Sequence, residues 1–165
     1  MKRVAAFLAM FVALAAMGKT PIPKPMPNAC EMLEAINIAT TLGTDVAYVP
    51  GTISENEYVR MSLCSAQTPD LSARMTLMVR ETLTETVPDA ETLCDTTIDA
   101  LRATIGATAV IEELDLGDAA IWVGDISQLT VWHHAGRVVF IFTPTPGQDK
   151  AAAEAAAREV LAAFP

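Results

Sequence analysis

The segment from Val138 to Phe142 is apolar at every position. Because successive side chains of a β-strand point to opposite faces of its sheet, such a strand needs cover on both faces. Two arrangements satisfy this need. Either helices lie on both faces of the sheet, or helices cover one face and a ligand or partner surface occupies the other. We favour the three-layer arrangement, with helices on both faces.

The rest of the chain predicts an α+β fold. Apolar residues at helical spacing predict helices over residues 29–42, 88–106 and 148–164. Alternating or short apolar runs predict strands at 45–49, 58–66, 71–81, 108–113, 119–123, 128–134 and 137–143. The pair Pro50-Gly51 predicts a turn that ends the first strand. Hairpin spacing then favours a mainly antiparallel sheet of about five to seven strands with three helices, in the order α-β-β-β-α-β-β-β-α.

The first residues have the layout of a secretory signal peptide. Met1, Lys2 and Arg3 form a cationic head, and residues 5–17 form an unbroken apolar run. That run is shorter than the about 20 apolar residues of a membrane span. We expect a signal peptide over residues 1–18, a proline-rich leader over 19–28 and one globular domain over 29–165. The mature protein would be periplasmic or secreted, with no stable membrane insertion; an uncleaved N-terminal anchor is the alternative.

The charge balance narrows the class of partner. The chain has 20 acidic and 11 basic residues, which gives a formal net charge of -9. Removal of the signal peptide takes away Lys2 and Arg3 but no acidic residue, so the mature charge is about -11. A surface of this sign opposes binding to nucleic acid, which needs a basic patch.

Three cysteines follow the predicted leader, at positions 30, 64 and 94. In an oxidising compartment three cysteines predict one disulfide and one remaining thiol, and the sequence alone allows three pairings. Their spacing fits no zinc pattern.

Several short motifs together resemble a known group of proteins. The segment Asn-Ala-Cys-Glu-Met-Leu at 28–33 leads into a helix ending at Leu42-Gly43, and a later strand carries Cys64. Leu-Gly-Asp-Ala-Ala at 116–120 precedes a strand hairpin, and an alanine-rich helix follows. This order resembles small exported cell-envelope domains of unknown function found as lipoproteins, which are similar to extracellular sensor domains of receptor kinases.

The resemblance implies a disulfide between Cys30 and Cys64, from the first helix to a strand. The chain departs from the group because it lacks a cysteine for lipid attachment and carries the additional Cys94. We expect Cys94 to be a buried free thiol, since free cysteine is among the most buried residue types. Its alternative role is an intermolecular disulfide or a reactive thiol.

No catalytic, cofactor-binding or metal-binding motif is predicted. We expect an exported non-enzymatic domain that binds a partner protein, a peptide or a small envelope ligand on a concave apolar patch beside one of its tryptophans. The alternatives are a hydrolase-like enzyme with an unrecognised site, in which a histidine meets a carboxylate, and a structural or oligomerising envelope component. The residues that we expect at the ligand surface are Trp122, Trp132, His133, His134 and Phe140.

Overall fold

The computed structural model describes residues 26–145 and 150–165. The predicted signal peptide over 1–18 lies outside the described residues, as does the predicted leader over 19–28 except for its last three residues. Within these two described ranges, no helix is long and apolar enough to cross a membrane.

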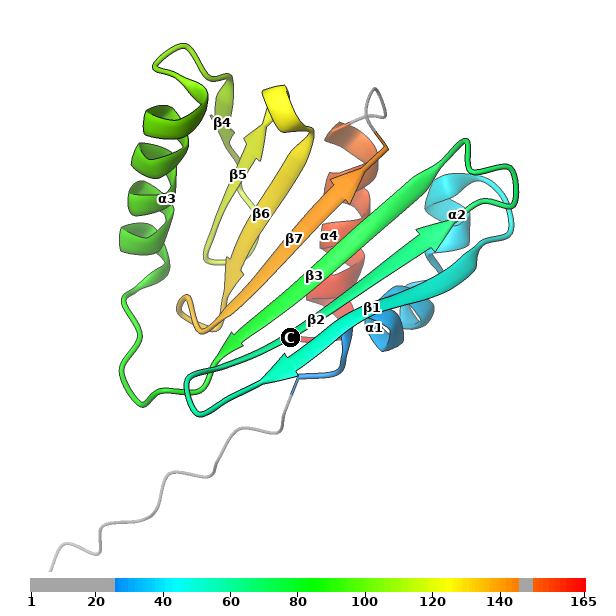
Figure 1. The fold of residues 1–165 in the computed structure, drawn as a ribbon, viewed down its shortest axis with the longest axis horizontal. Coiled ribbons are helices and arrows are strands. Elements are labelled where there is room, and N and C mark those ends of the chain that lie inside the picture. Colours follow the sequence, from blue (N-terminus) through cyan, green and yellow to red (C-terminus); the bar gives the residue numbers. More distant parts are fainter. Residues whose placement is uncertain (1–25, 146–149) are drawn as a thin grey trace, which may run out of the picture.

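The described chain forms one antiparallel sheet in the strand order β1-β2-β3-β7-β6-β5-β4 (Figure 1). Strands β3 and β7 pair at its centre, so the three strands from the first half of the chain join the four strands from the second half in one sheet. The strands are β1 (Ala47–Glu55), β2 (Val59–Gln67), β3 (Arg74–Thr82), β4 (Ile111–Glu113), β5 (Ala119–Val123), β6 (Gln128–His133) and β7 (Val138–Pro144).

Helices lie on both faces of this sheet, which confirms the α+β class. The helices are α1 (Ala29–Ala35), α2 (Ile38–Leu42), α3 (Ala90–Ile105) and α4 (Lys150–Ala163). We call the face covered by α1, α2 and α4 the closed face. Helix α3 lies on the other face, where it contacts β5 and β6 (Figure 1).

The predicted single helix over 29–42 is wrong, because the chain breaks at Asn37. This residue adopts a left-handed conformation (φ 48°, ψ 55°), which asparagine tolerates better than most residues. The predicted start is correct, since Asn28 and Glu31 form a capping box. Ile36 and Ile38 on either side of the break are both buried, so the break keeps two apolar side chains in the core.

The predicted turn at Pro50-Gly51 is also wrong. Strand β1 continues through both residues, with an irregular register between Pro50 and Ile53. An edge strand tolerates proline at a bulge, because one side of the strand has no pairing partner. A Cβ atom on Gly51 would lie 2.9 Å from Leu63 Cδ2, so glycine permits the close approach of β1 to β2.

Two predicted strands begin later than their patterns indicate. Leu71 is 69% exposed and has a positive φ of 59°, so β3 begins only at Arg74. Asp70 holds the preceding loop by accepting hydrogen bonds from Thr68 and Ser72. The predicted strand over 108–113 is ordered as a strand only at Ile111–Glu113.

The closed face contains the larger hydrophobic core. Phe140 and Phe142 of β7 are fully buried there, against α4 and its neighbours. The disulfide between Cys30 and Cys64 ties α1 to β2 with a Cα–Cα distance of 5.1 Å, which confirms the predicted pairing. The backbone N–H of Ala29 also donates to Ser62 Oγ at 3.0 Å, so both a covalent and a polar contact hold α1 on the sheet.

The opposite face is covered only in part. Ala90, Cys94 and Ile98 of α3 form a second, smaller core with side chains of β5, β6 and β7. Three layers therefore stack over that half of the sheet. Over β1, β2 and β3 this face has no helix among the described residues, and Leu63 and Met78 remain half-exposed there. We call this uncovered part the open face.

Candidate ligand-binding groove

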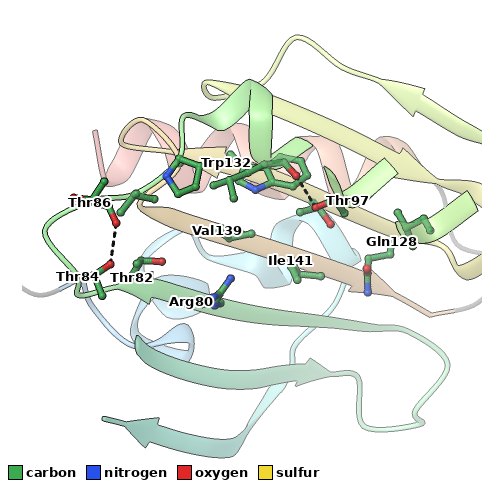
Figure 2. Close-up of a pocket in the computed structure, with 15 residues that line it drawn as sticks. Arg80, Thr82, Thr84, Thr86, Thr97, Gln128, Trp132, Val139 and Ile141 are labelled. Carbon is green, nitrogen blue, oxygen red and sulfur yellow. Dashed lines mark hydrogen bonds between the residues drawn. The ribbon is translucent and has the colours of Figure 1, made fainter. Parts of the chain in front are cut away.

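A groove of about 360 Å³ lies where α3 stops covering the sheet. Its floor comes from β6 and β7, one wall from α3, the other side from β3, and one end from the connection between β3 and α3 (Figure 2). We call it the α3 groove. It is the meeting point of the small core and the open face.

Two buried polar side chains of β6 form part of the floor. Thr130 and Trp132 lie two residues apart on the same face of the strand, and they are 5% and 3% exposed. Within the described ranges, neither the Thr130 hydroxyl nor the Trp132 indole N–H has a hydrogen-bond partner in the protein. A buried polar group without a partner costs about 1–3 kcal/mol, so both groups offer hydrogen bonds to a molecule in the groove.

The apolar part of the floor comes from Val139 and Ile141 of β7. These residues occupy the odd positions of the all-apolar segment, whereas Phe140 and Phe142 occupy the even positions on the closed face. The need for cover on both faces is therefore met by a helix layer on one side. On the other side the margin of α3 buries Val139, and Ile141 stays partly exposed on the groove floor.

Helix α3 supplies the wall through one stripe of its surface. Leu93, Thr97 and Leu101 recur every four residues and line the groove. The helix begins after Asp89, whose carboxylate accepts hydrogen bonds from the Thr92 backbone N–H and hydroxyl. These bonds hold the pKa of Asp89 below its usual value. The cap thus fixes where the wall starts.

The end of the groove is held by Arg137. Its guanidinium donates to the carbonyl oxygens of Thr82 and Thr84 at 2.9 and 2.8 Å, and to that of Glu85 at 3.3 Å. Gly136 beside it has a φ of +85°, and a Cβ atom there would lie 2.8 Å from Leu93 Cδ1. The β6–β7 turn and the start of α3 are therefore in close contact at this end.

Arg80 supplies the charge of the groove. It is the one charged side chain among the described residues of the lining, and no acidic side chain lines it. Figure 2 shows Arg80 beside Val139, its partner across β3 and β7. Arg80 makes no ion pair with any residue that the structure describes, whereas Arg60, Lys150 and Arg158 all do. In an acidic protein, this leaves an available positive charge at the rim.

The five residues of the predicted ligand surface lie on two faces of the sheet. Trp132 is in the α3 groove, but Trp122 and Phe140 are buried in the core of the closed face. His133 also points to that face, where its Nε2 lies 3.3 Å from the Phe164 carbonyl oxygen. His134 begins the β6–β7 turn with a positive φ. The residues therefore do not form one surface, because neighbouring strand positions alternate between faces.

The two histidine rings lie 4.1 Å apart. Burial lowers the pKa of His133, and the nearby His134 lowers it further. Asp118 lies near the same turn, but its Oδ2 accepts from the Ala135 backbone N–H at 2.7 Å. In the part of the chain that the structure describes, no carboxylate is hydrogen-bonded to either histidine, and no cluster of His, Cys, Asp and Glu side chains could hold a metal ion.

Cys94 is a free thiol in the small core beneath α3, and it is 6% exposed. Burial raises the pKa of this thiol, and the negative charges of Glu113, Asp95 and Glu91 raise it further. Because the thiolate is the reactive form, such a thiol is a poor nucleophile at neutral pH. It also lies too deep to reach another chain while α3 is in place.

Sequence reasoning did not identify Arg80, Thr130 or Arg137 as site residues. The alternation of residues 71–81 placed Arg80 on the solvent side of its strand, and Thr130 stands as a polar residue within an apolar strand. These are the signals that could have indicated a polar floor. The role of Arg137 depends on backbone carbonyls far along the chain, for which no local pattern exists.

Comparison with known proteins provides no relative for this chain. No protein family, no curated protein and no solved structure matches it.

Proposed function

We propose that the chain is an exported, non-enzymatic binding domain that holds a small ligand in the α3 groove. Support for export comes from the cationic head and apolar run of the N-terminal segment, together with the Cys30–Cys64 disulfide. Disulfides persist in oxidising compartments and are rare in the cytosol. The group of exported envelope domains that the sequence resembles fits this proposal.

The observation that carries the proposal is the pair of buried, unpartnered polar groups on the groove floor. Thr130 and Trp132 are both more than nine-tenths buried, yet each presents a polar atom that no described protein group satisfies. Native proteins rarely leave such groups unpaired without a reason. Their position side by side, beneath an opening of about 360 Å³, supports a ligand site.

The dimensions and composition of the groove also suit a small molecule. Ligand pockets typically span about 300–1,000 Å³ and combine apolar side chains with a few placed polar groups. The α3 groove has apolar side chains from α3 and β7 and hydroxyl groups from several threonines. One end is bounded by residues 84–88, which favours a compact ligand over an extended chain running through.

The groove can be tested by filling it. Thr97 lines the groove, and among the described residues its hydroxyl bonds only to the Leu93 carbonyl, so Thr97→Phe places a large ring in the opening. Thr96 makes the same type of bond, to Thr92, on the exposed side of α3, so Thr96→Phe is a matched control. We expect 1-anilinonaphthalene-8-sulfonate, whose fluorescence rises in apolar sites, to bind the wild-type protein and the Thr96→Phe variant at one site.

The Thr97→Phe variant should bind this probe at least tenfold more weakly while it keeps the wild-type circular dichroism spectrum and unfolding midpoint. Equal binding by all three proteins would mean that the probe does not use the groove and would contradict the proposed function. Export is tested separately by the intact mass of protein recovered from expressing cells. A mass that retains residues 1–18 would contradict cleavage of the signal peptide.

A further inference from the structure

We infer that the ligand of the α3 groove is a small amphipathic anion, whose acidic headgroup binds Arg80 and whose apolar body covers Val139 and Ile141. This inference rests on the proposed function and adds the chemical class of the ligand. It concerns a free small molecule with a carboxylate or a related acidic group.

The strand register places the relevant side chains in rows. Arg80 pairs with Val139 across β3 and β7, and Val139 pairs with Trp132 across β7 and β6. Arg80, Val139 and Trp132 therefore lie in one row across three strands, with the apolar residue in the middle. In the next row, Ile141 pairs with Thr130. Because adjacent strands lie about 4.8 Å apart, the backbones of Arg80 and Trp132 are about 10 Å apart.

This arrangement puts hydrogen-bond donors on both sides of an apolar strip. The Arg80 guanidinium lies on one side, and the Trp132 indole N–H and the Thr130 hydroxyl lie on the other. Figure 2 shows the Trp132 nitrogen on the ring edge that faces Val139. The arginine and indole groups can only donate, so their ligand must offer acceptor oxygens. An acidic headgroup offers several acceptors and forms the stronger, charge-assisted type of bond with arginine.

The charge distribution favours the same class. The chain carries 20 acidic residues, yet none of the described residues of the groove lining is acidic. Acidic residues of α3, such as Asp95 and Asp99, lie on its exposed side, away from the groove stripe at Leu93, Thr97 and Leu101. An anion therefore meets Arg80 without a like charge in the groove to oppose it.

The test compares two probes that share an apolar body. The first is 1-anilinonaphthalene-8-sulfonate, and the second is N-phenyl-1-naphthylamine, which lacks the sulfonate. We expect the anionic probe to bind the wild-type protein about tenfold more tightly than the neutral probe, as a charge-assisted hydrogen bond implies. In the Arg80→Gln variant this preference should disappear, because affinity for the anion falls about tenfold and affinity for the neutral probe is unchanged.

Arg74 provides the matched control. It lies on the same strand face as Arg80 but outside the groove, and it also makes no side-chain ion pair with a described residue. Arg74→Gln should leave the affinities for both probes unchanged. An equal loss of anion binding in both arginine variants would show a general charge effect and would overturn the assignment of the headgroup to Arg80.

A second substitution acts on the floor. Thr130→Val removes the buried hydroxyl while keeping the volume, so it should not lower the unfolding midpoint. It should lower the affinity for the anionic probe several-fold.

Decanoate, but not decanol at the same concentration, should displace the anionic probe. Displacement by decanol as well as by decanoate would contradict an acidic ligand.

The two proposals fail in different ways. If the anionic probe binds Thr97→Phe as well as it binds the wild-type protein, the groove is not a binding site and both proposals fall. If the wild-type protein binds both probes with equal affinity and Thr97→Phe abolishes both interactions, the binding function stands and the acidic ligand is wrong.

Discussion

The two faces of the sheet differ in how completely their side chains are covered. On the closed face, α1, α2 and α4 bury the aromatic side chains of β7, and a disulfide fastens α1 to β2. On the other face, α3 covers β5 and β6 but leaves a groove at its margin and an uncovered surface over β1, β2 and β3. The first face holds the larger hydrophobic core, and the second places polar side chains in a groove.

This difference assigns separate roles to the two faces. The closed face supplies most of the buried apolar area, which is the main source of folding stability. Among the described residues, the α3 groove keeps two buried donors that have no protein partner and an arginine that has no ion pair. Such features lower stability and are retained where they serve binding. Substitutions on the closed face should therefore lower stability more than binding, and substitutions in the groove should lower binding more than stability.

The largest stability effect is expected from the disulfide. Loss of the Cys30–Cys64 link, which closes a separation of 34 residues, should lower the free energy of unfolding by about 4 kcal/mol in the loop-entropy account. Urea unfolding of a Cys30→Ala, Cys64→Ala double variant measures this loss. Cys94→Ala serves as the control, since it removes a free thiol and keeps the disulfide. An equal loss in the control would contradict the special role of the link.

Neighbouring residues of β3 compare the two faces directly. Leu77 is fully buried on the closed face, and Met78 is half-buried on the open face. Leu77→Ala should lower the free energy of unfolding by about 3 kcal/mol, whereas Met78→Ala should cost about 1 kcal/mol or less. Chemical denaturation of both variants gives the comparison. Similar costs at the two positions would show that the open face is packed as tightly as the closed one.

A pair of glycines tests the end of the groove. Gly43 and Gly136 both have positive φ, but a Cβ atom has free space at Gly43 and would lie 2.9 Å from the Pro88 carbonyl oxygen at Gly136. Gly43→Ala should cost about 1 kcal/mol from backbone strain alone, and Gly136→Ala about 2 kcal/mol.

Only the Gly136→Ala change should also weaken binding of the anionic probe, because it moves the start of α3 relative to the β6–β7 turn. Thermal unfolding and probe titration of the two variants separate the effects. Unchanged probe affinity in the Gly136→Ala variant would indicate that the groove does not depend on this contact.

The smallest effect is expected from pH. Burial lowers the pKa of His133 below its usual 6.5, so the native state binds its proton less readily than the unfolded state. The stability that neutral His133 contributes is therefore fully present above the unfolded-state pKa of about 6.5. It is lost as the pH falls from that value through the lower pKa of the native state. Urea unfolding at pH 7.5 and 5.5 should show a slightly smaller difference in the His133→Asn variant. A larger difference in the variant would reverse the sign and contradict this account.

Much of the fold follows from patterns within single elements. The α+β class, the antiparallel sheet, the cover required on both sides of residues 138–142 and the helix start at Asn28 were all predictable, because each depends on local periodicity or capping. The break at Asn37 and the passage of β1 through Pro50-Gly51 were not. At Asn37 the break keeps Ile36 and Ile38 packed in the core, and at Pro50-Gly51 the chain stays paired with β2.

The groove was less predictable than the fold. Trp132 was expected at a concave surface, but the sequence could not separate it from Trp122, which faces the other side of the same half of the sheet. The position of the groove depends on where α3 comes to rest, and this is set by contacts between distant segments. The Arg137 guanidinium and Gly136 fix that position through residues 82–88, and no local pattern indicates such contacts.

The central claim is that ligands bind on the side of Trp132 and not on the closed face, where Trp122 lies. Fluorine NMR of protein labelled with 5-fluorotryptophan reports both tryptophans at once, with resonances assigned from Trp122→Phe and Trp132→Phe variants. Titration with decanoate should shift the Trp132 resonance in a saturable manner and leave the Trp122 resonance unchanged. A shift confined to Trp122, or equal shifts of both resonances, would contradict the assignment of binding to the α3 groove.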